Sequence, residues 1–219
     1  MIDNATLAGI RNRRSVRNFT SDPITDEQLE SILEAARWAP SGRNSQPWDF
    51  VVVRDQQTRT ALGRILKGIT FSWAGLAAAP AMIVVSVDQT ADPGHFVEDG
   101  AVAAQNLCLA AESLGLASSW AGVLSDRKTR TSAESAVSAL VGLPGTHRVI
   151  AVVPFGVGKN SQEATRRPLT EMVHYERYSE QPDSRIKSEP EAMTGAEDGT
   201  RGFAATAVPQ RQSRPGRFA

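Results

Sequence analysis

The sequence predicts a fold in which α and β layers are mixed, and three observations support it. Short apolar runs of strand length alternate along the chain with segments whose apolar residues recur at helical spacing. No strict internal repeat and no sustained heptad pattern is visible. At 219 residues the chain is long enough to bury a sizeable core, and this length favours one domain. The alternation is typical of a sheet that helices cover.

The individual elements follow from caps, breakers and apolar spacing. Asn4 can cap a short first helix, and the sequence Thr25-Asp26-Glu27-Gln28 forms a capping box at the start of a second helix. Pro40 cannot continue that second helix, and Gly115 is placed to end the longest one. The pattern predicts further helices over 58–67, 98–114 and 135–143, and strands over 48–53, 81–87, 116–120 and 147–155.

Composition and charge exclude several classes of protein. Lys plus Arg and Asp plus Glu are equal at 24 each, which argues against a general nucleic-acid binder. One cysteine excludes an internal disulfide framework and predicts a cytoplasmic protein. The N-terminus shows no signal-peptide pattern, and the longest apolar stretch, 75–87, is too short to span a membrane. Because apolar periodicity disappears near residue 179, we expect a folded domain over 1–178 and a disordered tail over 179–219.

Two polar segments are candidates for a binding site. The arginine segment, residues 11–17, can direct two or three guanidinium groups and a hydroxyl toward one anion. Taken alone, a solvated basic turn explains these residues equally well. The polar loop, residues 39–48, carries Ser, Asn and Gln side chains that offer both donors and acceptors, as a flavin pyrimidine edge or a nucleobase requires. Turn closure between a helix and a strand is the simpler explanation when this loop is taken alone.

Motifs for other chemistries are absent from the sequence. Gly156 and Gly158 follow a strand, but Ser161 stands where a dinucleotide-binding loop requires a third glycine. Neither a Walker-type lysine motif nor a G-x-S-x-G nucleophile elbow occurs. His95 has carboxylates at metal-ligand spacing, Glu98 and Asp99, but surface exposure is the simpler explanation for all three histidines, so we predict no metal site. Cys108 falls on an apolar helix face and is expected in the core rather than as a nucleophile.

Both polar segments belong to a longer ordered set of motifs. The set consists of Arg13-Arg14-Ser15-Val16-Arg17-Asn18-Phe19, Ala39-Pro40-Ser41 through Gln46-Pro47-Trp48, Asp99-Gly100-Ala101 with Gln105-Asn106-Leu107, Leu114-Gly115-Leu116, Pro154-Phe155-Gly156 and Arg166-Arg167-Pro168-Leu169. Each motif is moderately specific, whereas the order of all of them is strongly so. Over about residues 7–178 this set resembles the FMN-dependent nitroreductase family.

The resemblance implies an α+β fold, a nitroreductase-like α/β sandwich around a central mixed sheet. It also implies an intertwined homodimer with two FMN sites at its interface. In this family pattern the FMN phosphate and ribityl chain are held by Arg13, Arg14, Ser15 and Arg17, joined by Arg166. The partner subunit contributes Pro40, Ser41 and Asn44, with Gln46 close by. Backbone groups near the reactive N5 of the flavin come from Ala121 and Gly122.

The same resemblance implies an activity. The expected enzyme is an FMN-dependent oxidoreductase that takes hydride from NADPH or NADH and reduces electron-poor acceptors, such as nitroaromatics or quinones, in a ping-pong cycle. The cofactor carries the redox chemistry, so no side chain is predicted to be catalytic. Two alternatives stay open: an FMN-dependent oxidase or dehydrogenase of a small substrate on the same fold, and a non-catalytic protein that binds a flavin or deazaflavin. Neither nucleic acid nor a membrane is an expected partner.

Overall fold

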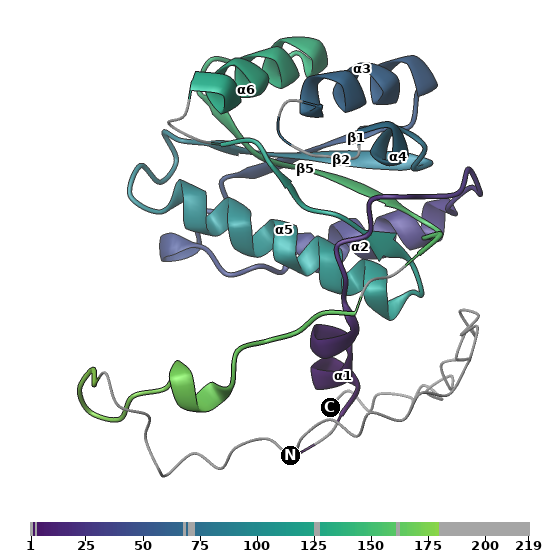
Figure 1. The fold of residues 1–219 in the computed structure, drawn as a ribbon. Helices are drawn as coiled ribbons and strands as arrows, with labels where there is room; N and C mark the ends of the chain where they lie inside the picture. Colours follow the sequence, from purple (N-terminus) through teal and green to yellow (C-terminus); the bar gives the residue numbers. More distant parts are fainter. Residues whose placement is uncertain are drawn as a thin grey trace, which may run out of the picture. The chain divides into compact units, whose positions relative to one another are not determined.

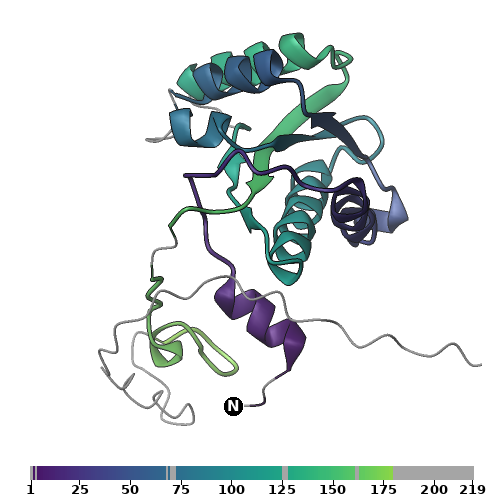
Figure 2. The same ribbon diagram turned by 90° about the vertical axis from the view of Figure 1, so that its right-hand side faces the viewer.

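The computed structural model describes residues 2, 4–67, 69, 73–124, 128–160 and 163–179 (Figures 1 and 2). The described chain divides into two compact units, the first within residues 2–160 and the second within residues 163–179. The first unit contains the sheet and the long helices. The second contains the short 3₁₀ helix η2, Leu169–Glu171, within its described part. Of the expected tail, 179–219, the structure describes residue 179, and the rest lies outside the described residues, so the domain boundary stays a prediction.

An antiparallel sheet forms the centre of the first unit. Its path runs β1–β2–β5–β3, and β4 also pairs with β5. The strands are β1 Trp48–Val53, β2 Ala81–Asp88, β3 Ala117–Ser118, β4 Ala121–Gly122 and β5 His147–Gly156. We expected a mixed sheet, but all pairs among these strands are antiparallel. The parallel component within the described residues is an isolated bridge between Ser15 and Ser118.

Helices cover both faces of this sheet, as Figure 1 shows. Successive side chains of a strand point to opposite faces, so the run Met82–Val85 of β2 serves two cores. Ile83 and Val85 pack with helices α2 and α5, whereas Met82 and Val84 pack with α3, α4 and α6. The helices are α1 Ala5–Asn12, α2 Asp26–Arg37, α3 Gln56–Leu66, α4 Trp73–Ala77, α5 Phe96–Ser113 and α6 Lys128–Val141.

The predicted caps are confirmed. The Asn4 side chain accepts a hydrogen bond from the backbone N–H of Leu7, and Thr25 and Gln28 form the reciprocal bonds of a capping box. Gly115 has a φ of +73°, the left-handed conformation that glycine adopts readily at the end of a helix. Helix α4 was missed because five residues are too few to show a helical period. None of the helices in the described part of the chain is long and apolar enough to cross a membrane.

Candidate functional site

The arginine segment leaves α1 and continues as extended chain beside β3, joined to it by an isolated bridge. The backbone N–H of Val16 donates to the carbonyl of Ser118 at 2.9 Å, and Ser15 forms the parallel bridge with the same residue. Val16 and Phe19 are buried, at 6% and 1% exposure. Their side chains anchor this extended segment in the core that the sheet shares with α3, α4 and α6. Because side chains alternate along an extended chain, Ser15 and Arg17 face outward, and both are exposed.

Arg14 has a local partner at the end of α1. Its Nη1 atom donates to the carbonyls of Arg11, Asn12 and Arg13 at 2.6, 3.0 and 3.1 Å. These are carbonyl groups of the kind that a helix C-terminus leaves without intrahelical partners, and a guanidinium there also complements the helix dipole. Arg14 is therefore a C-terminal cap of α1 in this structure. Its predicted contact with a phosphate stays a prediction.

Glu112, near the end of α5, lies within the electrostatic reach of the arginine segment. Burial raises the pKa of the Glu112 carboxyl, and the positive charges of Arg14 and Arg13 act against that rise. Arg17 has no side-chain hydrogen bond or ion pair in the described part of the chain. The segment thus presents Ser15 and Arg17 to solvent at the sheet end where β3 lies.

The polar loop has an unusual backbone. Arg43, Asn44 and Gln46 have φ values of 54°, 57° and 49°. Each of these left-handed conformations costs a non-glycine residue roughly 1 kcal/mol, somewhat less for Asn. The loop partly closes on itself, because the hydroxyl of Ser41 accepts the backbone N–H of Gln46 at 3.0 Å. Asn44 and Gln46 remain exposed, and Pro40 before them is exposed too.

Two buried carboxylates, Asp99 and Asp92, contact the polar loop on its inner side. Asp99 accepts the backbone N–H of Gly42 at 3.0 Å and the hydroxyl of Ser45 at 3.4 Å. Asp92 is fully buried and lies 3.3 Å from the guanidinium of Arg43. A Cβ on Gly42 would overlap Oδ2 of Asp92, so any larger residue here would have to displace this carboxylate.

Asp92 keeps its charge despite burial. Burial alone would raise the pKa of this carboxyl, but hydrogen bonds from His95 and from the backbone N–H of Gly94 outweigh it and hold the pKa below its usual value. The Nδ1 atom of His95 lies 3.2 Å from both carboxylate oxygens. Sequence reasoning did not assign a supporting role to Asp92 or Asp99. For Asp99 a signal existed: it lies four residues before Ala103 and eight before Leu107, on the buried face of α5.

Ala121 and Gly122 form β4 beside β5. Ala121 pairs with Val152 and is buried, whereas Gly122 pairs with Ala151 and is half-buried. This strand begins three residues after Ser118, the residue that pairs with the arginine segment. The structure therefore brings Ser15, Ser118 and β4 to the same part of the sheet. Whether the backbone of β4 reaches a flavin stays a prediction.

Arg166 belongs to the second unit. It is exposed, and its Nη1 atom donates to the carbonyl of Thr165 at 2.8 Å. The predicted cooperation of Arg166 with the arginine segment stays a prediction.

The arginine segment and the polar loop lie at opposite ends of α5. The loop is tied to Asp99 in the first turn, whereas the arginine segment lies near Glu112 in the last turn. With a rise of 1.5 Å per residue, the helix places these two positions about 20 Å apart. One copy of the chain therefore does not bring the two predicted parts of the site together.

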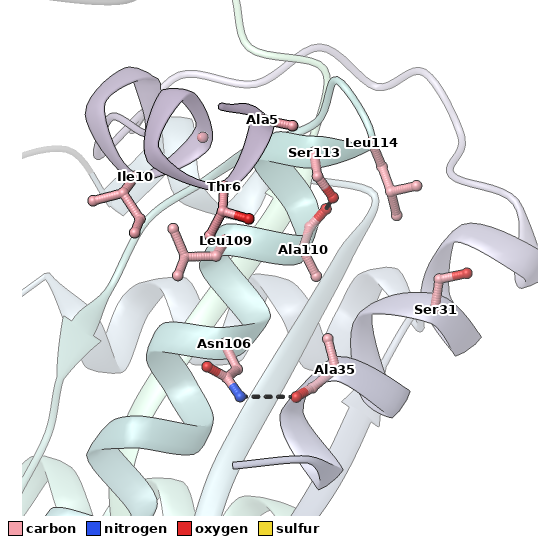
Figure 3. A pocket seen from close by; sticks show the side chains of 11 residues that line it. Ala5, Thr6, Ile10, Ser31, Ala35, Asn106, Leu109, Ala110, Ser113 and Leu114 are labelled. Carbon is pink, nitrogen blue, oxygen red and sulfur yellow. Dashed lines mark hydrogen bonds between the residues drawn. The ribbon is translucent and has the colours of Figure 1, made fainter. Parts of the chain in front are cut away.

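Two hollows in the first unit contain none of the predicted site residues. A groove of about 380 Å³ lies between α1, α2 and α5, where Asn106 donates to the carbonyl of Ala35 (Figure 3). A second hollow, of about 790 Å³, lies between α2 and β1. The described residues form no cluster of three metal-ligating side chains. Cys108 is buried in the core as predicted, and its burial raises the pKa of the thiol.

Comparison with known proteins decides the family. The model of the nitroreductase family matches residues 10–72 and 69–157, more than half of the chain. This chain belongs to the nitroreductase family. Its residues are 37% identical over 178 positions to a protein of Archaeoglobus fulgidus provisionally named NADH dehydrogenase/NAD(P)H nitroreductase, covering 78% of this chain and 98% of the relative. The family expectation from the ordered motifs is thereby confirmed.

Two solved structures resemble the fold of this chain. The NADPH:FMN oxidoreductase of Vibrio harveyi, solved with NAD⁺, matches with a TM-score of 0.69 and 29% identity, over 80% of this chain and 79% of that one. An FMN-dependent nitroreductase of Clostridium difficile matches with a TM-score of 0.70 and 26% identity, over 78% and 99%. The predicted α+β class is confirmed, with the antiparallel sheet described above.

Proposed function

We propose that this protein is an FMN-dependent oxidoreductase that uses NAD(P)H to reduce electron-poor acceptors. The observation that carries the proposal is the arginine segment, which is held extended beside β3 with Ser15 and Arg17 turned to solvent. Similarity to proteins named as NAD(P)H nitroreductase and NADPH:FMN oxidoreductase supports the same activity.

The residues present fit FMN by the chemistry of their donors. A phosphate needs guanidinium and hydroxyl donors, and Ser15 and Arg17 have no competing side-chain partner within the described residues. An isoalloxazine edge needs donors and acceptors together, and the exposed amides of Asn44 and Gln46 supply both. When bound, FMN supplies the hydride chemistry, and the protein's residues bind and orient the reactants.

The separation of the two segments along α5 supports a site built by two copies. A ligand that contacts both the arginine segment and the polar loop would have to bridge about 20 Å along the helix within one copy. In a symmetric dimer, the loop of one protomer can instead complete the site that begins at the arginine segment of the other. We therefore propose a homodimer with two shared sites.

The proposed reaction requires no side chain as acid or base, because the cofactor carries the redox chemistry. Near the arginine segment the described residues offer cations, a hydroxyl, backbone groups and the carboxyl of Glu112. The cations and backbone N–H groups can stabilise negative charge on a bound ring or phosphate. A cytoplasmic location and acceptors such as nitroaromatics or quinones are parts of this proposal that rest on sequence composition and on the family pattern.

An absorbance experiment tests the proposed function. The purified protein is loaded with FMN, made anaerobic, and treated first with NADPH and then with NADH. We expect one of the two to bleach the flavin band, and an added quinone or nitroaromatic to restore it. A flavin that binds but stays oxidised with both donors would contradict the reductase activity. Failure to bind FMN at all would contradict the whole proposal.

A further inference from the structure

We propose that Asp99 is a positioning residue, which holds the polar loop in the conformation that receives the flavin ring. This inference rests on the proposed FMN-dependent function. Asp99 is 4% exposed and lies beneath the loop, so its carboxylate does not itself reach a ligand. Asp99 acts on the loop through hydrogen bonds from Gly42 and Ser45, the two loop residues that it contacts.

The two contacts of Asp99 enclose the strained part of the loop. One carboxylate oxygen accepts from Gly42 and the other from Ser45. Between these two points lie Arg43 and Asn44, which both adopt left-handed backbone conformations. Non-glycine residues persist in such conformations only where surrounding contacts determine them. Asp99 supplies two of those contacts with a single side chain.

The start of α5 is a favourable place for this carboxylate. Asp99 lies in the first helical turn, where the helix dipole and free backbone N–H groups stabilise negative charge. Asp92, just before the helix, adds a second buried carboxylate that contacts Arg43 and closely approaches Gly42. The polar loop is therefore held both by the first turn of α5, through Asp99, and by the segment just before that helix, through Asp92.

The consequence of this attachment is a preformed polar surface. With Gly42 and Ser45 fixed, the two amide side chains of the loop, Asn44 and Gln46, are exposed, and Gln46 is further oriented by a 3.4 Å hydrogen bond from its Nε2 atom to the carbonyl of Asn44. A ligand that binds these amides does not have to order them first, so preorganisation contributes to its affinity. We therefore expect that weakening the hydrogen bonds of Asp99 to Gly42 and Ser45 reduces binding of the flavin ring and leaves binding of the phosphate unchanged.

Asp99→Asn is the direct test. The amide keeps the size of the side chain. Its Oδ1 can still accept from Gly42 and its NH₂ group can donate to the Ser45 hydroxyl, so both contacts persist but lose the strength that the carboxylate charge gives them. We expect the Kd for FMN to rise about tenfold, as the change from hydrogen bonds with a charged acceptor to neutral ones predicts. The Kd for riboflavin should rise by the same factor, because riboflavin lacks only the phosphate. Flavin fluorescence quenching measures both constants.

Two further variants separate positioning from general destabilisation. Glu134→Gln is the matched control, since Glu134 is also a buried carboxylate that accepts a backbone N–H, that of Val149, and it lies on α6 away from the loop. It should lower Tm while changing the FMN Kd by less than about twofold. Ser45→Ala removes only one hydroxyl donor, so it tests the same contact if Asp99→Asn fails to fold, with an expected rise in Kd of about threefold for both flavins.

The outcomes distinguish this inference from the proposed function. If the wild-type protein binds FMN but the Asp99 and Ser45 variants bind it equally well, the positioning role is wrong while the function stands. If FMN binding weakens but riboflavin binding does not, the effect lies at the phosphate end and the inference is likewise overturned. If the wild-type protein does not bind FMN, both the proposed function and this inference are wrong.

Discussion

The arginine segment and the polar loop are held in place in opposite ways. Backbone pairing with Ser118 and the buried side chains of Val16 and Phe19 fix the arginine segment, while Ser15 and Arg17 stay exposed. In the polar loop the backbone itself is strained, and two buried carboxylates hold it: Asp99 in the first turn of α5, and Asp92 in the segment just before α5. The first segment thus offers long cationic side chains on an extended backbone, and the second offers a backbone with left-handed residues.

This difference matches two kinds of recognition. A phosphate is a compact anion that flexible guanidinium groups can reach from several directions. A flat ring with donors and acceptors on its edge requires partners at fixed positions. Substitutions of the residues that support the polar loop should therefore weaken flavin binding by altering the shape of the loop. Substitutions in the arginine segment should weaken it by removing positive charge near the phosphate.

The largest effect is expected where the loop's shape is most constrained. Gly42→Ala introduces a Cβ that would overlap Asp92 and lie 3.0 Å from Nδ1 of His95. We expect it to lower the free energy of unfolding by about 1–3 kcal/mol and to abolish FMN binding. Denaturant titration and flavin fluorescence measure the two effects. Gly9→Ala on α1 is the control, because nothing lies within 4 Å of its Cβ, and wild-type stability in Gly42→Ala would refute the account of the loop.

The next effect concerns charge. Arg17→Ala should weaken FMN binding by about 1.5–3 kcal/mol, the range for a hydrogen bond to a charged group, and should leave riboflavin binding nearly unchanged. Calorimetric titration with both flavins measures this. Arg64→Ala, which removes an exposed cation on α3, should leave both affinities as they are. Equal losses for FMN and riboflavin would show that Arg17 does not contact a phosphate.

A smaller effect on FMN affinity is expected for Arg14 than for Arg17, although both belong to the arginine segment. Because Arg14 caps α1, Arg14→Ala should lower stability by about 0.5–1 kcal/mol through the loss of contacts to the terminal carbonyls. Its effect on FMN affinity should be smaller than that of Arg17→Ala. If Arg14→Ala instead weakens FMN binding more than Arg17→Ala does, Arg14 contacts the FMN phosphate as the family pattern implies.

The smallest expected effect is on the pH dependence of stability at acid pH. The pKa of Asp92 in the folded protein is lower than in the unfolded chain, so its contribution to stability is complete above about pH 4 and is lost as pH falls through the folded value. Asp92→Asn should therefore flatten the acid side of a stability profile measured by Tm. Asp55→Asn is the comparison, since the contact with Thr58 lowers the pKa of Asp55 at the start of α3, away from the loop. An unchanged acid limb in Asp92→Asn would contradict the lowered pKa.

Much of the fold could be predicted from local sequence patterns, and the supports of the site could not. The caps at Asn4 and Thr25 and the strand over 48–53 depend on neighbouring residues, so the sequence predicts them closely. The contact between Asp99 and Gly42 joins residues far apart in the chain and forms only once α5 packs beside the loop. The left-handed conformations at Arg43 and Gln46 have no local signal either, because such residues rarely adopt them without tertiary contacts.

The central claim is that one flavin site takes its arginine segment from one copy and its polar loop from the other. Two differently tagged chains, one carrying Arg17→Ala and the other Ser41→Ala with Asn44→Ala, would be co-expressed and purified as mixed dimers. We expect each variant alone to bind FMN weakly, and each mixed dimer to have one site of wild-type affinity, because one of its two sites combines the unchanged segments. Mixed dimers without any wild-type site would show that both segments of a site come from the same chain and would contradict the claim.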